Sequence, residues 1–86
     1  MTNNELFERI VKICKKVARP SYGFSFNFFE DCDGIFHITV KFFEYDGFIG
    51  AIKLLLEMSV EWVVNKIENE EIFIFKTKDC FLKVDF

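Results

Sequence analysis

Residues 24–43 read FSFNFFEDCDGIFHITVKFF, and this stretch decides the fold. Apolar residues alternate with other residues on both sides of a polar centre, a pattern typical of half-buried antiparallel strands. The centre, residues 30–34, combines aspartates that favour turn entry with Gly34, which accepts positive φ, so it predicts a hairpin loop. The alternating positions are Phe24, Phe26 and Phe28 before the loop and Phe36, Ile38, Val40 and Phe42 after it.

A helix is predicted ahead of this hairpin. Thr2 followed three residues later by Glu5 is a capping-box pattern, which favours a helix start. Pro20 is expected to end the helix, because a proline disfavours helical backbone at the residue before it. Between them an apolar stripe recurs at helical spacing and consists of Leu6, Ile10, Ile13, Cys14 and Val17.

A second helix and two more strands are predicted after the hairpin. Asp46 and Gly47 interrupt the preceding strand, and the helix is expected to run from about residue 48 to about residue 67. Residues 65–71 are polar and acidic and would end it. The strands are expected at residues 72–76 and 80–86, joined by a short hairpin at residues 77–79.

These elements predict an α+β fold in the order α-β-β-α-β-β. The simplest arrangement is a two-layer sandwich, in which two helices cover one face of a four-stranded antiparallel sheet. A ferredoxin-like βαββαβ unit gives the same order when its first strand is moved to the end, and this permuted ferredoxin-like order is a fold-level analogy that carries no function. With 86 residues, the chain is expected to form one domain, residues 1–86.

Composition and charge exclude several classes of protein. A content of 51% hydrophobic residues with 4 Gly and 1 Pro excludes a disordered tail or linker. The net charge of −3 disfavours non-specific nucleic-acid binding. No signal peptide is recognisable, and the longest apolar stretch, residues 49–64, is interrupted by charges, so we expect no membrane contact. Three cysteines without a C-x-x-C pair fit reduced thiols in a cytoplasmic protein.

The predicted second helix is apolar around more of its circumference than a core-facing helix needs. Its apolar arc is roughly 240°, whereas a stripe of roughly 100° suffices to face a core. The additional edge consists of Leu55, Met58 and Trp62. Either the first helix packs along this edge, or the edge binds a partner or a second copy. Glu57 and Glu61 belong to an acidic region, which is either a solvated face or a surface that steers the basic groove of a partner toward it.

The face of the sheet that points away from the helices is predicted to be partly aromatic. Phe29, Phe43 and Phe81 are expected there, together with Lys41 and Lys83. Either a partner covers this face or long lysine side chains shield it. Alternatively, the aromatic rings would stack on bases of a single-stranded nucleic acid while the lysines bind its phosphates. An uncharged sheet edge is a second route to a partner, because it can accept a strand from another chain.

Signatures of catalysis and of metal binding are missing from the sequence. His37 is the single histidine, and no neighbour in the sequence supplies the partner that an acid–base pair needs. Cys32 lies between Asp31 and Asp33, which disfavour a thiolate. Cys32, His37 and Cys80 have the side chains that suit zinc, but their spacing does not support a site. We therefore predict no enzyme activity, no metal and no cofactor.

The leading hypothesis is a small, non-enzymatic protein that binds a larger protein, as inhibitor, immunity and adaptor proteins do, or that pairs with itself as a homodimer. The bias toward Phe, Ile, Lys, Asn and Glu indicates an AT-rich genome of a prokaryote or its phage. Phage-borne inhibitors of CRISPR defence (anti-CRISPR proteins) belong to this physical class. Single-stranded nucleic-acid binding on the open sheet face is the alternative. The candidate interface residues are Leu55, Met58, Trp62, Phe29, Phe43, Phe81, Glu57 and Glu61.

Overall fold

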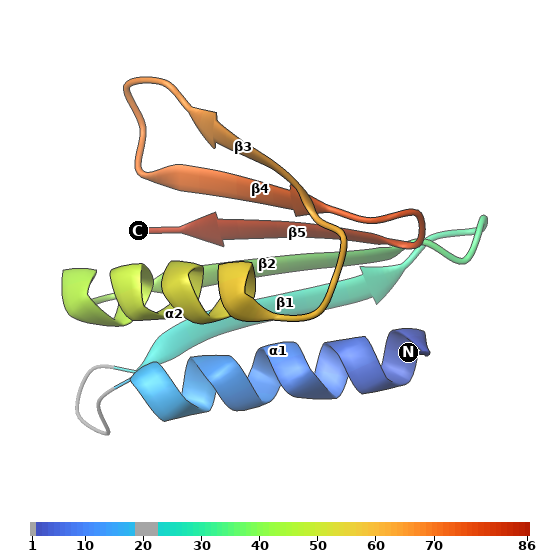
Figure 1. Cartoon of the computed structure of the whole chain (residues 1–86), viewed down its shortest axis with the longest axis horizontal. Helices are drawn as coiled ribbons and strands as arrows, with labels where there is room; N and C mark the ends of the chain where they lie inside the picture. The colour runs from blue at the N-terminus through green and yellow to red at the C-terminus, as the bar shows by residue number, and fades with distance from the viewer. Residues whose placement is uncertain (1, 19–22) are drawn as a thin grey trace.

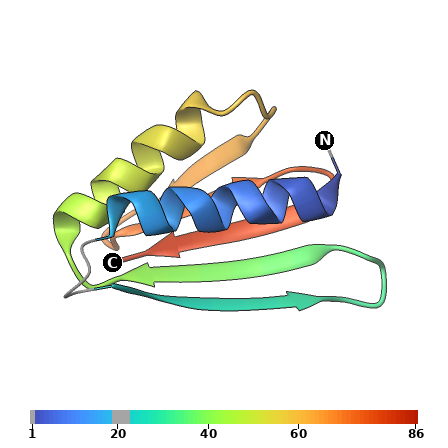
Figure 2. The same ribbon diagram turned by 90° about the horizontal axis from the view of Figure 1, so that it is seen from below.

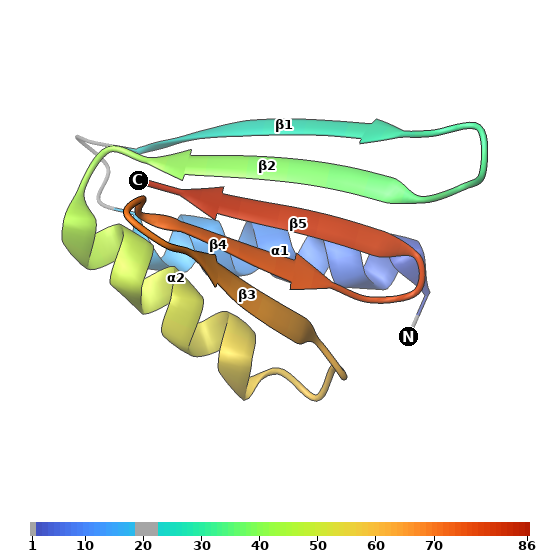
Figure 3. The same ribbon diagram turned by 90° about the horizontal axis from the view of Figure 1, so that it is seen from above.

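The computed structural model describes residues 2–18 and 23–86, and these form two helices on one face of a five-stranded sheet (Figure 1). The strand order across the sheet is β1-β2-β5-β4-β3. The views of Figures 2 and 3 show both helices on the same side of the sheet. The elements are α1 (Asn3–Val17), β1 (Phe24–Glu30), β2 (Phe36–Phe42), α2 (Tyr45–Glu57), β3 (Val63–Ile67), β4 (Ile72–Lys76) and β5 (Cys80–Asp85).

The predicted first hairpin is confirmed in its strands and in its turn. β1 and β2 pair antiparallel, with Phe24 opposite Phe42 and Glu30 opposite Phe36. Asp31 shapes the loop, because its Oδ1 accepts hydrogen bonds from the backbone N–H groups of Asp33 at 2.8 Å and Ile35 at 3.0 Å. Gly34 has φ of 77°, the left-handed conformation that glycine adopts without steric cost.

The first helix begins as its sequence predicts. The backbone N–H of Glu5 donates to Thr2 Oγ1 at 3.2 Å, which satisfies one of the free donors at the helix start. The predicted stripe faces the sheet, and its residues Leu6, Ile10 and Cys14 are buried. Pro20, expected to end the helix, lies outside the described residues.

The second helix is shorter than predicted. It ends at Glu57, and the segment expected to form its last third contains β3 (Val63–Ile67). β3 pairs antiparallel with β4, and Asn69 between them has φ of 65°, a turn conformation that asparagine tolerates better than most residues. The β-branched residues Val63, Val64 and Ile67 fit a strand better than a helix, because branching at Cβ restricts χ1 on a helix.

The sheet is mixed rather than fully antiparallel, and it has five strands rather than four. β2 and β5 are parallel neighbours at its centre, with Ile38 opposite Leu82, whereas the other three pairings are antiparallel. The additional strand β3 explains the change, because β3, β4 and β5 form a meander that reverses direction twice. The last strand therefore runs parallel to β2, and the chain departs from a permuted ferredoxin-like order.

The core lies between the helices and one face of the sheet. Val40, Leu82 and Phe75 contribute the inner side chains of β2, β5 and β4, and each is fully buried. The helices approach each other where Val17 of α1 meets Gly50 of α2. A Cβ atom built at Gly50 would lie 3.2 Å from Val17 Cγ1, so a larger residue there would crowd the contact. From this contact the two helices diverge toward the other end of the sheet (Figure 2).

The apolar edge predicted on the second helix does not exist as one exposed helix face, because the helix stops before reaching Trp62. Leu55 is a core residue with 1% exposure, and Met58 and Trp62 are half-buried against the core. Trp62 Nε1 donates to the backbone oxygen of Leu55 at 3.1 Å. Its ring meets Phe75 edge to face, with centroids 5.5 Å apart. Trp62 thus packs the segment that connects α2 and β3 against the core.

We expect Trp62→Ala to destabilise the protein by about 2–4 kcal/mol, because the substitution removes a large packed ring and its hydrogen bond. Urea unfolding followed by circular dichroism measures this. Leu56→Ala is the matched control, since Leu56 is 55% exposed on α2, and its cost is expected within about 0.5 kcal/mol. Equal effects of both substitutions would contradict a structural role for Trp62.

Candidate functional site

The outer face of the sheet lies opposite both helices (Figure 3). Its side chains form a mixed apolar and basic surface. Its residues follow from strand alternation and the registers, since the alternate positions on β2 and β5 are buried. Phe29 at one end and Val63 at the other are the most exposed of its apolar side chains, at 59% and 62%. The outer face comprises Ser25, Asn27 and Phe29 of β1, His37, Thr39 and Lys41 of β2, Phe81, Lys83 and Asp85 of β5, Ile72, Ile74 and Lys76 of β4, and Val63, Asn65 and Ile67 of β3.

A row of rings crosses the outer face from β1 through β2 to β5, and Lys76 of β4 lies next to it. The rings of Phe29 and His37 are stacked, with centroids 4.6 Å apart and planes inclined by 4°. The ring centroids of His37 and Phe81 lie 5.9 Å apart, and Lys76 Nζ lies 5.1 Å from the centroid of the Phe81 ring. The register continues this row to Val63 on β3. The row therefore brings together two predicted site residues, Phe29 and Phe81.

His37 has a carboxylate partner, which the sequence analysis missed. Its Nε2 lies 2.8 Å from Asp31 Oδ2. The hydrogen bond from His37, together with the bonds from the hairpin backbone, lowers the pKa of Asp31 below its ordinary value. The hairpin backbone holds Asp31 in place, and Asp31 in turn orients the His37 ring, which stacks on Phe29.

The charges of the outer face differ in sign from the charge of the whole chain. Among its described residues, Lys41, Lys76 and Lys83 outnumber Asp85. The chain as a whole carries −3. Lys83 is half-buried among its neighbours, while Lys41 and Lys76 are exposed. The outer face is therefore locally basic and fits an acidic counterpart.

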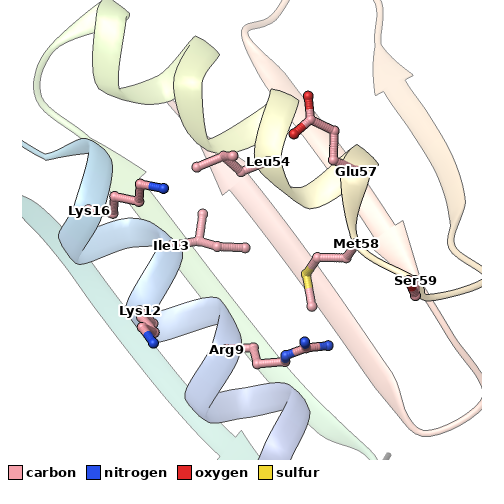
Figure 4. A pocket seen from close by; sticks show the side chains of 8 residues that line it. All are labelled: Arg9, Lys12, Ile13, Lys16, Leu54, Glu57, Met58 and Ser59. Atoms are coloured by element: carbon pink, nitrogen blue, oxygen red, sulfur yellow. The ribbon is translucent and has the colours of Figure 1, made fainter.

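The remaining predicted site residues do not join the outer-face row. Leu55 lies in the core, Phe43 is exposed just beyond the end of β2, and Glu61 is exposed in the link before β3. Glu57 and Met58 instead line a groove of about 390 Å³ between the two helices, which opens where the helices diverge. Figure 4 shows this groove, whose other lining residues are Arg9, Lys12, Ile13, Lys16, Leu54 and Ser59.

The three cysteines lie in two different environments. Burial raises the pKa of the Cys14 thiol to about 12 and that of Cys80 to about 11, so both remain protonated at neutral pH. Cys32 is exposed in the hairpin loop. Across residues 2–18 and 23–86, no three His, Cys, Asp or Glu side chains are grouped so that they could hold a metal ion.

Comparison of the chain with family models, curated proteins and solved structures gave no match. Neither helix in the described part of the chain has the length and apolar character needed to span a membrane. The function is therefore inferred from the geometry of the outer face and the sheet edges.

The Asp31–His37 pair predicts an acid-sensitive contribution to stability. Because the folded-state pKa of Asp31 is lowered, its stabilising effect is present above about pH 4, where the unfolded carboxyl ionises, and disappears as the pH falls through the folded pKa. We expect Asp31→Asn to lower the free energy of unfolding at pH 6, and this penalty is expected to shrink as the pH falls through the folded pKa of Asp31. Denaturant titrations across the acidic range measure this, with Asp33→Asn as control. A penalty independent of pH would contradict the role of the ionised carboxylate.

Proposed function

We propose that this chain is a non-enzymatic interaction protein that docks the outer face of its sheet onto an acidic and partly apolar surface of a larger protein. The observation that carries this proposal is the uncovered, lysine-bearing face opposite both helices. Proteins of the inhibitor, immunity and adaptor type act by occupying such a surface of a partner. The proposal includes a phage-borne or mobile-element inhibitor, among them the anti-CRISPR type, and its support is the composition, which is typical of an AT-rich genome.

The apolar residues of the outer face are arranged for contact with another surface. Val63, at 62% exposure, and Ile67, at 39%, lie at opposite ends of β3. The register sets Ile67 opposite Ile72, while Phe29 ends the ring row on the far strand. Exposed apolar groups interspersed with basic ones are typical of interaction surfaces. The lysines between them specify an acidic counterpart, because a basic partner would be repelled.

The arrangement of the rings counts against the alternative, binding of single-stranded nucleic acid. Base stacking needs an aromatic face that is free to receive the base. On the outer face, Phe29 stacks on His37, and Lys76 lies over the ring of Phe81 while His37 lies beside it. A neighbouring side chain therefore already lies against each of these rings. The net charge of −3 further opposes a phosphate backbone.

We expect binding to the protein partner to be lost when acidic residues replace the exposed apolar ends of the outer face. The variant Phe29→Glu/Val63→Glu is expected to weaken affinity at least tenfold, because buried anchors dominate binding energy. Leu56→Glu is the matched control, since Leu56 is similarly exposed on α2. Capture of the partner from the source cells, followed by calorimetry with each variant, measures this. Loss of binding in Leu56→Glu, with the outer-face variant unaffected, would contradict the proposal.

The nucleic-acid alternative has its own test. We expect no binding of oligothymidylate to the wild-type protein at 50 mM salt, measured by fluorescence anisotropy, for the reasons of ring geometry and charge given above. Binding that weakens steeply with added salt, and that Lys41→Glu/Lys83→Glu abolishes, would favour the nucleic-acid function over the protein partner.

A further inference from the structure

The two edges of the sheet are built differently. β3, at one edge, has five residues and carries Lys66, a charge of the kind that blunts unwanted strand pairing. β1, at the other edge, has seven residues, and its only charge is Glu30 at its end. No proline or lysine interrupts it. By the usual criteria, β1 is the unprotected edge, open to a further strand.

The hairpin loop fixes which backbone groups of β1 face outward. The N–H of Asp31 donates to the oxygen of Ile35 at 3.0 Å, so this pair belongs to the hydrogen-bonded kind. Hydrogen-bonded and non-hydrogen-bonded pairs alternate along an antiparallel ladder. The odd-numbered residues of β1 therefore bond to β2. The N–H and C=O groups of its even-numbered residues, Phe24, Phe26, Phe28 and Glu30, point to the free edge.

Phenylalanine side chains flank this edge on both faces of the sheet. Phe28 points to the helix side yet is 44% exposed, and Phe29 on the outer face is 59% exposed. Phe7 of α1 packs on the helix side here, at 4.5 Å from Phe28 and 5.6 Å from Phe26 between ring centroids. β1 is the strand farthest from α2 in the sheet, as Figure 3 shows. Phe7, Phe26 and Phe28 thus form a phenylalanine cluster that is only partly buried.

We propose that β1 pairs antiparallel with β1 of a second copy, about a twofold axis at Asn27, so that two sheets join edge to edge. This register pairs all seven residues of β1, and it matches the outward-facing backbone groups of one copy with those of the other. Phe26 then lies beside the partner's Phe28, which completes the phenylalanine cluster around Phe7. The single charge, Glu30, faces the partner's Phe24, so no like charges oppose each other.

Symmetry favours a second copy over an unrelated strand. A twofold interface must be complementary to itself, and β1 meets this condition because Phe26 and Phe28 are equally spaced about Asn27. The same register keeps both pairs of helices on one side of the joined sheet, since residues of equal parity pair. The outer face stays uncovered in this dimer, so edge pairing and outer-face docking have separate readouts, which are dimerisation of the protein alone and binding of the larger partner.

A cysteine at the axis tests the pairing directly. Asn27 forms a non-hydrogen-bonded pair with itself, for which Cα atoms lie about 4.5 Å apart, within the range of a disulfide. In a Cys32→Ser background, which removes the exposed thiol, we expect Asn27→Cys to form a disulfide-linked dimer on mild oxidation. Ser25→Cys is the control, because the two copies of residue 25 would lie about 13 Å apart and should not crosslink. Equal crosslinking of both variants, or none in Asn27→Cys, would overturn the proposal.

A second experiment introduces charges at the same position, Asn27, and measures dimerisation. Asn27→Lys and Asn27→Glu each place like charges across the axis, and each is expected to weaken dimerisation several-fold in sedimentation. A mixture of the two variants is expected to recover the dimer, which also shows that both fold. Wild-type protein that stays monomeric at hundreds of micromolar, or variants that dimerise as well alone as mixed, would overturn the pairing. Failure here leaves the outer-face proposal intact, since that face needs no second copy.

Discussion

The parallel pairing of β2 with β5 is the constraint on which the rest of the structure depends. These two strands form the centre of the sheet, and their inner side chains are almost fully buried, among them Ile38, Val40, Leu82 and Val84. Parallel neighbours require a crossover connection, here α2 with the β3–β4 hairpin. That connection places α2 beside α1 on one face of the sheet. No helix or strand among residues 2–18 and 23–86 covers the opposite face, and the candidate interaction surface is a consequence of the connection.

The sequence identified the elements whose hydrophobic period is unambiguous. The β1–β2 hairpin alternates with period two and α1 repeats with helical spacing, so both are confirmed. The apolar residues within residues 58–67 fit both the helical period and the strand period. No Gly or Pro lies between α2 and β3 to separate the two elements. The signals available were the β-branched pair Val63–Val64 and a turn-forming Asn69. Because β3 was not predicted, the expected direction of β5 was the reverse of the observed one. The predicted sheet was therefore fully antiparallel, whereas the observed sheet is mixed.

The candidate site, like the fold, was predicted only in part. Phe29 and Phe81 were predicted on the outer face from alternation alone, and the ring row contains both. The partner of His37 was missed because Asp31 lies in the loop six residues away, where only the turn geometry brings its carboxylate back over the strand. The interface assigned to Leu55 was wrong, because its basis was a helix extending through Trp62, whereas the chain turns back and buries Leu55.

The exposed apolar edge at β1 has a physical cause in the packing of the helices. Gly50 lets α2 approach α1 closely at Val17, and from this contact α2 runs toward the β3 side of the sheet. Two helices in contact cover roughly 20 Å across a sheet, about the distance from the first to the fifth strand. Any displacement toward β3 therefore leaves β1 overhanging. The described residues, 2–18 and 23–86, contain no third helix to cover the overhang, so the phenylalanines of β1 remain partly exposed unless another polypeptide buries them.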